Sequence, residues 1–212
     1  AGAGSGKTRV LTYKVIYLIK EKNIDPFNIL MVTFTNKAAN EMKDRVQKFL
    51  EFKVQSSKFK VPTISTFHSL CAKILRIEGK YLGISSRFSI YDEEDSLDTI
   101  KEAMKRLSLS PKDFKPKSIL TTISQAKNEL IRASEYLNFA RGYFQEAVAR
   151  VYPMYQAILK DNDALDFDDL LLKTIELFKK NPEVLEKYQS KFRYILVDEY
   201  QDTNHAQYYL TK

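Results

Sequence analysis

Glycine is concentrated at one place in this chain, and this distribution limits the possible folds more than any other feature. Only 6 of the 212 residues are glycine, and three of them, Gly2, Gly4 and Gly6, lie within the first six positions. Lys7 and Thr8 follow, and apolar residues then recur at helical spacing. A glycine-rich turn that opens an amphipathic helix is typical of a phosphate-binding loop, so we expect an α/β domain that carries one.

The segment 1–8 matches the general form of this loop, except that Ala1 stands where that form has glycine. In such a loop, consecutive backbone N–H groups surround the phosphates, which requires the backbone freedom of glycine. Lys7 would neutralise phosphate charge, and the Thr8 hydroxyl would hold Mg²⁺. The alternative is a flexible tail. Because such a loop follows a strand and residue 1 already lies inside the motif, we expect the chain to be part of a longer protein.

Strands and helices alternate in the first third of the chain, which favours a parallel sheet covered by helices. The apolar patterns predict strands at 29–35, 63–67 and 194–197, and helices at 10–22, 36–50 and 68–77. Between them the pattern is mostly helical, with stripes at 97–107, 119–130 and 148–158 and a further helix at 166–180. Pro153 lies inside the third stripe and should kink that helix. We therefore predict an α/β domain (1–83 and 191–212) with an all-helical subdomain inserted at 84–190.

The residues after the last predicted strand are candidates for the second half of the nucleotide site, of which the phosphate-binding loop is the first. Ile195–Val197 is apolar and would be a buried strand, and Asp198 and Glu199 come directly after it. Parallel α/β sheets bind ligands at the carboxyl ends of their strands, so these two carboxylates would face the nucleotide. Asp198 would bind Mg²⁺, and Glu199 would orient and activate the attacking water. The alternative interpretation is a strand that ends in a polar turn.

Four segments together resemble the UvrD/Rep/PcrA group of superfamily 1 helicases, and within it the PcrA type most. The segment 198–204 (DEYQDTN) resembles motif II of the group, and 33–39 (TFTNKAA), with Glu41, Met42 and Arg45, resembles motif Ia. The segment 66–69 (TFHS) resembles the next motif, and 166–170 (DFDDL) resembles the acidic element before motif II. The order and spacing of these segments fit over the whole chain.

The resemblance implies a RecA-like P-loop domain that forms part of an ATP-dependent motor moving 3′ to 5′ along single-stranded DNA. The implied partners are single-stranded DNA, a duplex junction and a second RecA-like domain of the same parent chain, whose arginines would reach the γ-phosphate. ATP and Mg²⁺ are the implied cofactors. The implied catalytic residues are Lys7 and Glu199, the metal ligands are Thr8 and Asp198, and the ATP-binding residues are Gly2, Ala3, Gly4, Ser5, Gly6, Lys7, Thr8 and Arg9.

The resemblance also implies a set of DNA contacts at the ends of two predicted strands. These candidates are Phe34, Thr35, Asn36, Lys37, Thr66, Phe67 and His68. An aromatic ring there would stack on a base, and the polar groups would bind backbone phosphate. From the residues alone, the favoured explanation of the segment 34–36 is capping of the second helix by Thr35 or Asn36 and burial of Phe34, and the resemblance favours DNA contact instead.

Other conspicuous residues have structural explanations. Asp166, Asp168 and Asp169 are explained as an acidic first helical turn with Asp166 as N-cap, which disfavours a metal or nuclease centre. Cys71 lies in an apolar helical stretch and should be buried and unreactive. The aromatic residues of the insertion should belong to its core, namely Tyr136, Phe139, Tyr143 and Phe144.

Charge and composition narrow the class of protein further. The formal net charge is +7, and residues 1–80 carry 15 basic against 6 acidic side chains, which favours a polyanionic partner there. The single cysteine excludes a disulfide within the chain and fits a cytoplasmic location, and no apolar run is long enough to span a membrane.

Two further functions stay open at this point. One is a nucleic-acid- or partner-binding fragment that hydrolyses nothing alone, and the other is the motor half of a helicase-nuclease. A phosphate-loop kinase of small molecules would explain Gly6, Lys7 and Thr8 but not the segment 198–204.

Overall fold

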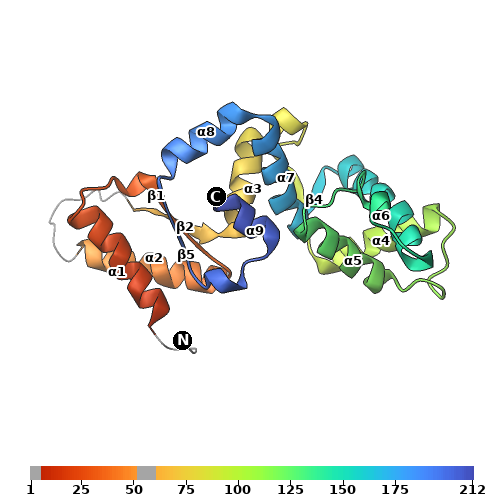
Figure 1. Ribbon diagram of the computed structural model, residues 1–212, viewed down its shortest axis with the longest axis horizontal. Coiled ribbons are helices and arrows are strands. Elements are labelled where there is room, and N and C mark those ends of the chain that lie inside the picture. The colour runs from red at the N-terminus through yellow and green to blue at the C-terminus, as the bar shows by residue number, and fades with distance from the viewer. Residues whose placement is uncertain (1–5, 52–60) are drawn as a thin grey trace. The chain divides into compact units, whose positions relative to one another are not determined.

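The computed structural model describes residues 6–51 and 61–212 (Figure 1). Gly2, Ala3, Gly4, Ser5, the Lys7 side chain and the loop 53–60 lie outside the described residues. The chain forms two compact units: unit 1 contains residues 1–70 and 181–203, and unit 2 contains residues 71–180 and 204–210. These divisions differ from the boundaries expected at 83/84 and 190/191, which stay predictions.

Unit 1 is an α/β unit. Its elements are α1 (Lys7–Lys20), η1 (Pro26–Asn28), β1 (Ile29–Thr33), α2 (Asn36–Glu51), β2 (Thr63–Thr66), α8 (Pro182–Lys191), β5 (Tyr194–Val197) and η4 (Tyr200–Asp202). Helix α3 (Phe67–Glu78) begins in unit 1 and continues into unit 2.

The three strands of unit 1 form one parallel sheet in the order β2–β1–β5. Thr33 lies opposite Thr66, and Val32 lies opposite Val197, so the three strands end at the same edge. The predicted parallel sheet is therefore confirmed: β5 has the predicted bounds, whereas β1 and β2 end two residues and one residue earlier than the apolar pattern suggests. The polar residues that follow the strands all emerge at this carboxyl edge.

Helices α1 and α2 pack together on one face of this sheet, where Figure 1 draws them beside β1 and β2. Their contact is apolar because each helix turns one stripe inward. The core there consists of Val15, Leu18, Ile29, Met31, Met42, Val46 and Leu50. This packing fixes the first turn of α1 relative to the carboxyl ends of the strands.

One expectation about the sheet is wrong. The strand β5 is not fully buried, since Tyr194 is 37% and Ile195 is 40% exposed. The reason is its position: among the described strands β5 pairs only with β1, so one of its edges carries no partner there. Asp198, directly after the strand, is nevertheless only 5% exposed.

Unit 2 is mostly helical. Its elements after α3 are η2 (Gly79–Leu82), β3 (Ser89–Tyr91), α4 (Glu93–Arg106), α5 (Pro116–Asn128), η3 (Tyr136–Asn138), α6 (Tyr143–Asp161), β4 (Ala164–Asp166), α7 (Phe167–Lys180) and α9 (His205–Leu210). The prediction of an all-helical insertion is wrong in one respect, because β3 and β4 pair as a two-stranded parallel sheet. Strands of three residues carry too little alternation to be recognised from sequence.

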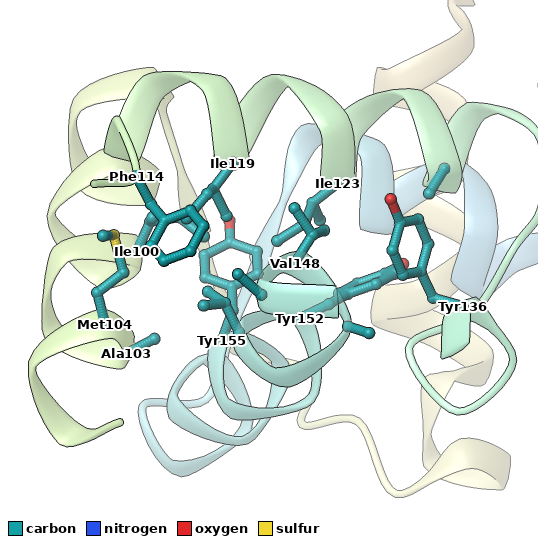
Figure 2. Close-up of a cluster of buried hydrophobic side chains, with 14 of the residues drawn as sticks. Ile100, Ala103, Met104, Phe114, Ile119, Ile123, Tyr136, Val148, Tyr152 and Tyr155 are labelled. Atoms are coloured by element: carbon teal, nitrogen blue, oxygen red, sulfur yellow. The ribbon is translucent and has the colours of Figure 1, made fainter. Parts of the chain in front are cut away.

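The predicted helical stripes of unit 2 form its core, as Figure 2 shows. Ile100 and Met104 come from α4, Ile119 and Ile123 from α5, and Val148 from α6, and each is at most 1% exposed. Local signals place the helix ends: Asp92 and Asp95 form a reciprocal capping box before α4, and Pro116 occupies the first turn of α5. Helix α6 continues through the exposed Pro153.

The expectation that four aromatic residues of the insertion are buried is only partly correct. Tyr136 is 7% exposed and packs edge-on against Tyr152, and Phe144 packs against the core. Phe139 and Tyr143 are 60% and 75% exposed, so for them the expectation is wrong. Both lie outside the inward stripe of α6, since Phe139 precedes that helix and Tyr143 is its first residue.

Cys71 is buried as predicted, and its chemistry can be tested. It is 1% exposed, and burial raises the pKa of its thiol to about 12, although a hydrogen bond with Thr174 acts in the opposite direction. At pH 8 only about one thiol in 10⁴ is therefore ionised, so we expect alkylation by iodoacetamide to be very slow in the folded protein and fast in denaturant. Mass spectrometry of the peptide that contains Cys71 measures this, and equal rates in both conditions would contradict it.

Candidate nucleotide and nucleic-acid site

The candidate site residues of unit 1 converge on the carboxyl edge of its sheet. Phe34 follows β1, Phe67 follows β2, and Asp198 follows β5, where its backbone N–H donates to Val32 O at 2.9 Å. This is the edge at which parallel α/β sheets bind ligands. These three predicted residues therefore lie at one edge of the sheet although they are spread over most of the chain.

The start of α1 has the backbone geometry that a phosphate loop requires. Gly6 has φ of 79°, in the left-handed region where residues with a side chain are strained. The backbone N–H of Val10 donates to Gly6 O at 3.0 Å, so the first helical turn closes directly after this glycine. The first turn carries no acidic side chain, so the positive end of the helix is left available for an anion.

Thr8 and Asp198 meet at this edge. The Thr8 hydroxyl donates to Asp198 Oδ2 at 3.3 Å, across a separation of 190 residues. This contact brings the two predicted halves of the site together. Neither segment predicts this contact by itself.

The donor set at Thr8 and Asp198 fits Mg²⁺. Asp198 Oδ1 is buried and has no hydrogen-bond partner among the described residues, which leaves one carboxylate oxygen for a cation. Mg²⁺ is commonly held by one or two protein oxygens together with phosphate oxygens and water. Among the described residues there is no cluster of three or more His, Cys, Asp or Glu side chains that could hold a metal ion.

Glu199 has a strained backbone. Its φ of 49° and ψ of 45° lie in the left-handed region, which is uncommon for a residue other than glycine. Its carboxylate accepts from Gln201 Nε2 at 2.5 Å, and its backbone oxygen accepts from the Asp202 N–H at 2.9 Å. Strain of this kind costs about 1–3 kcal/mol and is found most often at functional sites.

Arg9 faces solvent beside Tyr13. Its guanidinium donates to the Tyr13 hydroxyl at 3.3 Å and lies 5.5 Å from the centre of the same ring. The structure thus gives Arg9 a partner on its own helix, and its predicted contact with ATP stays a prediction.

Thr35 was assigned two roles from the sequence, a cap of the second helix and a contact with DNA, and the structure bears on both. Its hydroxyl accepts from the Ala38 N–H at 3.1 Å, so Thr35 caps α2 as the simpler interpretation predicts. Thr35, Asn36 and Lys37 are nevertheless all exposed. Their side chains and the first turn of α2 are therefore accessible to a polyanion.

Phe34 and Phe67 form a ring pair at the ends of β1 and β2. Their centroids lie 5.9 Å apart with the planes at 59°, a tilted geometry that is favourable for aromatic rings. Phe67 is only 2% exposed, whereas Phe34 is half-buried. Phe67 therefore supports the ring of Phe34 from behind.

Thr66 and His68 flank this ring pair. The Thr66 hydroxyl donates to Ser69 Oγ at 2.8 Å and accepts from the Ser69 N–H at 3.1 Å, so it caps α3. Thr66 is 6% exposed, and His68 is half-buried. Of these two residues, His68 has the more accessible side chain for a ligand.

Sequence reasoning missed a buried charge network in unit 2. Lys127 Nζ lies 2.6 Å from Asp166 Oδ2 and 2.9 Å from Asp169 Oδ1, and its side chain has no exposed surface. Asp166 also accepts from the Asp169 N–H at 2.8 Å, which confirms its predicted capping role. One sequence feature indicates such a network: Lys127 follows Ile123 by four residues, so a charged side chain occupies an apolar helical stripe.

The charges of this network compensate one another. Burial alone would lower the pKa of Lys127, but Asp166 and Asp169 raise it above its ordinary value. Burial would likewise raise the pKa of Asp166, and the charge and hydrogen bond of Lys127 lower it. The hydroxyl of Tyr155 donates to Asp166 at 2.7 Å, so the network is closely hydrogen-bonded as well as ion-paired.

A parallel sheet with a helix N-terminus, a paired threonine and a metal-competent carboxylate at its carboxyl edge defines a P-loop nucleotide-binding domain. The model of the UvrD/REP helicase N-terminal domain matches residues 1–212. The chain therefore belongs to that family, and the RecA-like P-loop fold predicted from its sequence is confirmed.

The curated relatives agree with this assignment. The chain is 54% identical over its whole length to the ATP-dependent DNA helicase PcrA of Bacillus subtilis (strain 168). It is 50% identical to the PcrA helicase of Staphylococcus aureus (strain NCTC 8325 / PS 47) and 49% identical to that of Staphylococcus epidermidis. It spans 28% of the length of each of these relatives.

Proposed function

We propose that this chain is the ATP-binding portion of an ATP-dependent DNA helicase that moves 3′ to 5′ on single-stranded DNA. The observation that carries the proposal is the contact of Thr8 with Asp198 at the carboxyl edge of the sheet, with Asp198 Oδ1 left for a cation. The relatives named PcrA, which are ATP-dependent DNA helicases, support the same function for the parent protein.

Each residue of the phosphate site has a distinct role in this proposal. The backbone of residues 2–6 and the side chain of Lys7 bind the phosphates, and Lys7 neutralises charge that develops as the γ-phosphate leaves. Thr8 and Asp198 would hold Mg²⁺, which would supply positive charge to offset that of the phosphates. Glu199 orients the attacking water and accepts its proton.

The DNA-binding role rests on the residues after β1 and β2. Phe34, supported by Phe67, offers its ring to a base, and the stacking of one base contributes about 1–3 kcal/mol. The exposed Thr35, Asn36 and Lys37 bind the sugar-phosphate backbone, and Thr66 and His68 flank the same strand of DNA. The excess of basic side chains in residues 1–80 supports this assignment.

The proposal extends to the partners of the parent protein. A second RecA-like domain of the same chain would close the nucleotide site, and the helical unit 2 would contact a duplex junction. A DNA substrate would also place the parent protein in the cytoplasm. No helix in the described part of this chain is long and apolar enough to cross a membrane.

The experiment that tests the proposal uses the full-length parent protein. We expect single-stranded DNA to increase its rate of ATP hydrolysis severalfold, and we expect this stimulation to weaken as salt rises, because the contacts with DNA phosphates are screened. Blunt duplex DNA of the same sequence is the control. An ATPase rate that is indifferent to single-stranded DNA would contradict the proposal.

The direction of movement is measured separately with streptavidin bound to one end of a biotinylated oligonucleotide. A motor that moves 3′ to 5′ displaces streptavidin from the 5′ end faster than from the 3′ end. Faster displacement from the 3′ end would contradict the proposed direction and leave the ATPase assignment intact.

A further inference from the structure

Helix α1 has two apolar stripes, one packed on the sheet of unit 1 and one exposed. Val15 and Leu18 belong to the core that α1 shares with β1 and α2. Val10, Tyr13 and Tyr17 recur at spacings of three and four residues on the opposite side of the helix, and they are 66%, 44% and 43% exposed. A helix at the surface of a domain usually presents polar side chains on that side. The second apolar stripe therefore indicates a binding surface.

The exposed stripe forms one wall of a groove between α1 and α2, which lie side by side in Figure 1. The rings of Tyr13 and Phe49 contact each other there, with centroids 5.4 Å apart and planes at 57°. The Lys20 ammonium donates to Phe49 O at 3.2 Å and joins the last turns of the two helices. The groove has a volume of about 760 Å³, and the described residues that line it are Tyr13, Ile16, Tyr17, Lys20, Glu21, Lys48 and Phe49.

The charges around this groove are mostly positive. Lys20 and Lys48 line it together with one acidic residue, Glu21. Lys14 and Lys22 lie 5.5 and 5.7 Å from the ring centre of a tyrosine in its wall. Four lysines and one glutamate give this surface a net charge of +3. A second copy of the chain would bring the same positive charge to it, so the occupant that fits is an acidic molecule.

The rings of the groove favour an acidic peptide over a nucleic acid. Bases bind aromatic side chains by stacking on a ring face. Lys14 and Lys22 lie over the Tyr17 ring, and the Tyr13 ring already contacts Phe49. The groove instead offers apolar volume for aliphatic side chains, with ammonium groups beside it for carboxylates. An amphipathic helix binds a groove in this way, through apolar side chains that share one of its faces.

The groove lies away from the proposed nucleotide and DNA sites of unit 1. Thr8 is in the first turn of α1, and Asn36 begins α2 after β1, so both helices start at the carboxyl edge of the sheet. The groove is built by the second half of α1 and the last turn of α2. Tyr17 follows Thr8 by nine residues, about 14 Å along the helix axis. An occupant of the groove therefore leaves the carboxyl edge accessible.

We propose that the groove between α1 and α2 binds an acidic amphipathic segment of a partner protein. Apolar side chains of the segment enter the groove beside Tyr17 and Phe49. Its carboxylates pair with Lys14, Lys22 and Lys48. The apolar contacts hold the segment, and the lysines select the sign of its charge. Such an interaction attaches this protein to another one without blocking the edge where Thr8 and Asp198 meet.

The test uses the full-length parent protein and a fluorescein-labelled peptide, EELLEELFEELLEE, whose apolar residues share one face of a helix. Fluorescence anisotropy measures the binding. One control peptide has the same composition with its apolar residues spread over all faces, and another has lysine in place of every glutamate. The acidic amphipathic peptide should bind at least about 10-fold more tightly than either control, and its affinity should fall as salt rises. Binding no tighter than that of the controls would overturn the proposal.

Two variants of the parent protein locate the site. Tyr17→Ser removes an exposed ring of the groove, and Lys14→Glu combined with Lys22→Glu reverses two charges while keeping every apolar side chain. Each should weaken binding of the acidic peptide at least about fivefold. Lys187→Glu combined with Lys191→Glu, on α8 of the same unit, changes the charge equally and should alter the affinity less than about twofold. Wild-type affinity in both groove variants would contradict the assignment.

Two further measurements separate the proposed occupant from the alternatives. Oligo(dT) should leave the peptide bound, and displacement of the peptide by oligo(dT) would assign the groove to nucleic acid and overturn the proposal. Sedimentation of the parent protein tests the second alternative, since self-association that Tyr17→Ser abolishes would assign the groove to a second copy. The ATPase activity of Tyr17→Ser should equal that of the wild type, because the groove and the carboxyl edge lie at opposite ends of α1.

Discussion

Glu199→Gln in the parent protein is expected to bind ATP normally and to lose its DNA-stimulated turnover. The amide keeps the size of the side chain and its hydrogen bond with Gln201, but it cannot accept a proton from water. Removal of a general base lowers the rate by about 10²–10⁴-fold. Steady-state ATPase assays with single-stranded DNA, and equilibrium titration with a fluorescent ATP analogue, measure the two effects separately.

The comparison with Lys7 and with a surface glutamate makes this result specific. Lys7→Ala should also abolish stimulated turnover, but it should weaken nucleotide binding as well, because it would remove the charge that we propose neutralises the phosphates. Glu183→Gln changes an exposed carboxylate of α8 in the same unit and should behave as the wild type. Normal stimulated turnover in Glu199→Gln would refute the role assigned to Glu199.

The second large effect is expected on stability. Lys127→Met should lower the free energy of unfolding by about 3–5 kcal/mol, because it leaves Asp166 and Asp169 buried and facing each other without a cation. Lys101→Met is the matched control: Lys101 is paired with Asp98 on the surface, where such a pair contributes about 0–1 kcal/mol. Urea titration followed by far-ultraviolet circular dichroism measures both variants.

The loss in Lys127→Met should depend on pH. Burial and the charge of Asp166 already raise the pKa of Asp169. Without Lys127, burial should raise the pKa of both carboxyl groups above their unfolded value of about 3.9. A carboxyl group whose pKa is raised in the folded state stabilises the protein when the pH is below the pKa of that group in the unfolded chain. This stabilisation is lost as the pH rises through the raised pKa of the folded state. The deficit relative to the wild type should therefore be smallest near pH 4 and largest near pH 7.

A triple variant separates charge from packing. Lys127→Met combined with Asp166→Asn and Asp169→Asn removes all three charges and keeps an acceptor at position 166 for the N-terminus of α7. We expect it to be more stable at pH 7 than Lys127→Met alone, since no buried charge is left uncompensated. A triple variant as unstable as the single variant would show that the loss comes from packing and not from charge.

The sequence predicts the parts of this protein that rest on local patterns. The start of α1 after Gly6, the apolar strand β1 and the stripes of α4 and α5 are recognisable because glycine position and apolar periodicity act over short distances. The pairing of Thr8 with Asp198 was also predicted, but only because a phosphate loop and a carboxylate after a strand imply one common ligand.

The features that were missed depend on tertiary contacts. The strand pair β3 and β4 is too short to carry a pattern, and the exposure of Ile195 depends on which strands lie beside β5. The ion pairs of Lys127 and the hydrogen bond of Asn128 with Asn204 join residues 39 to 76 positions apart. A lysine on an apolar stripe shows that a counter-charge exists, but the sequence does not identify it.

The strands β3 and β4 have a consequence for how this protein can be shortened. They run in the same direction, with Ser89 opposite Ala164 and Tyr91 opposite Asp166. Antiparallel neighbours can be joined by two residues, whereas parallel neighbours require a connection that returns along their whole length, about a dozen residues or more. Residues 92–163 therefore cannot be replaced by a tight hairpin. A minimal version of this domain, whether natural or engineered, must keep a return path, and the simplest one is a single helix.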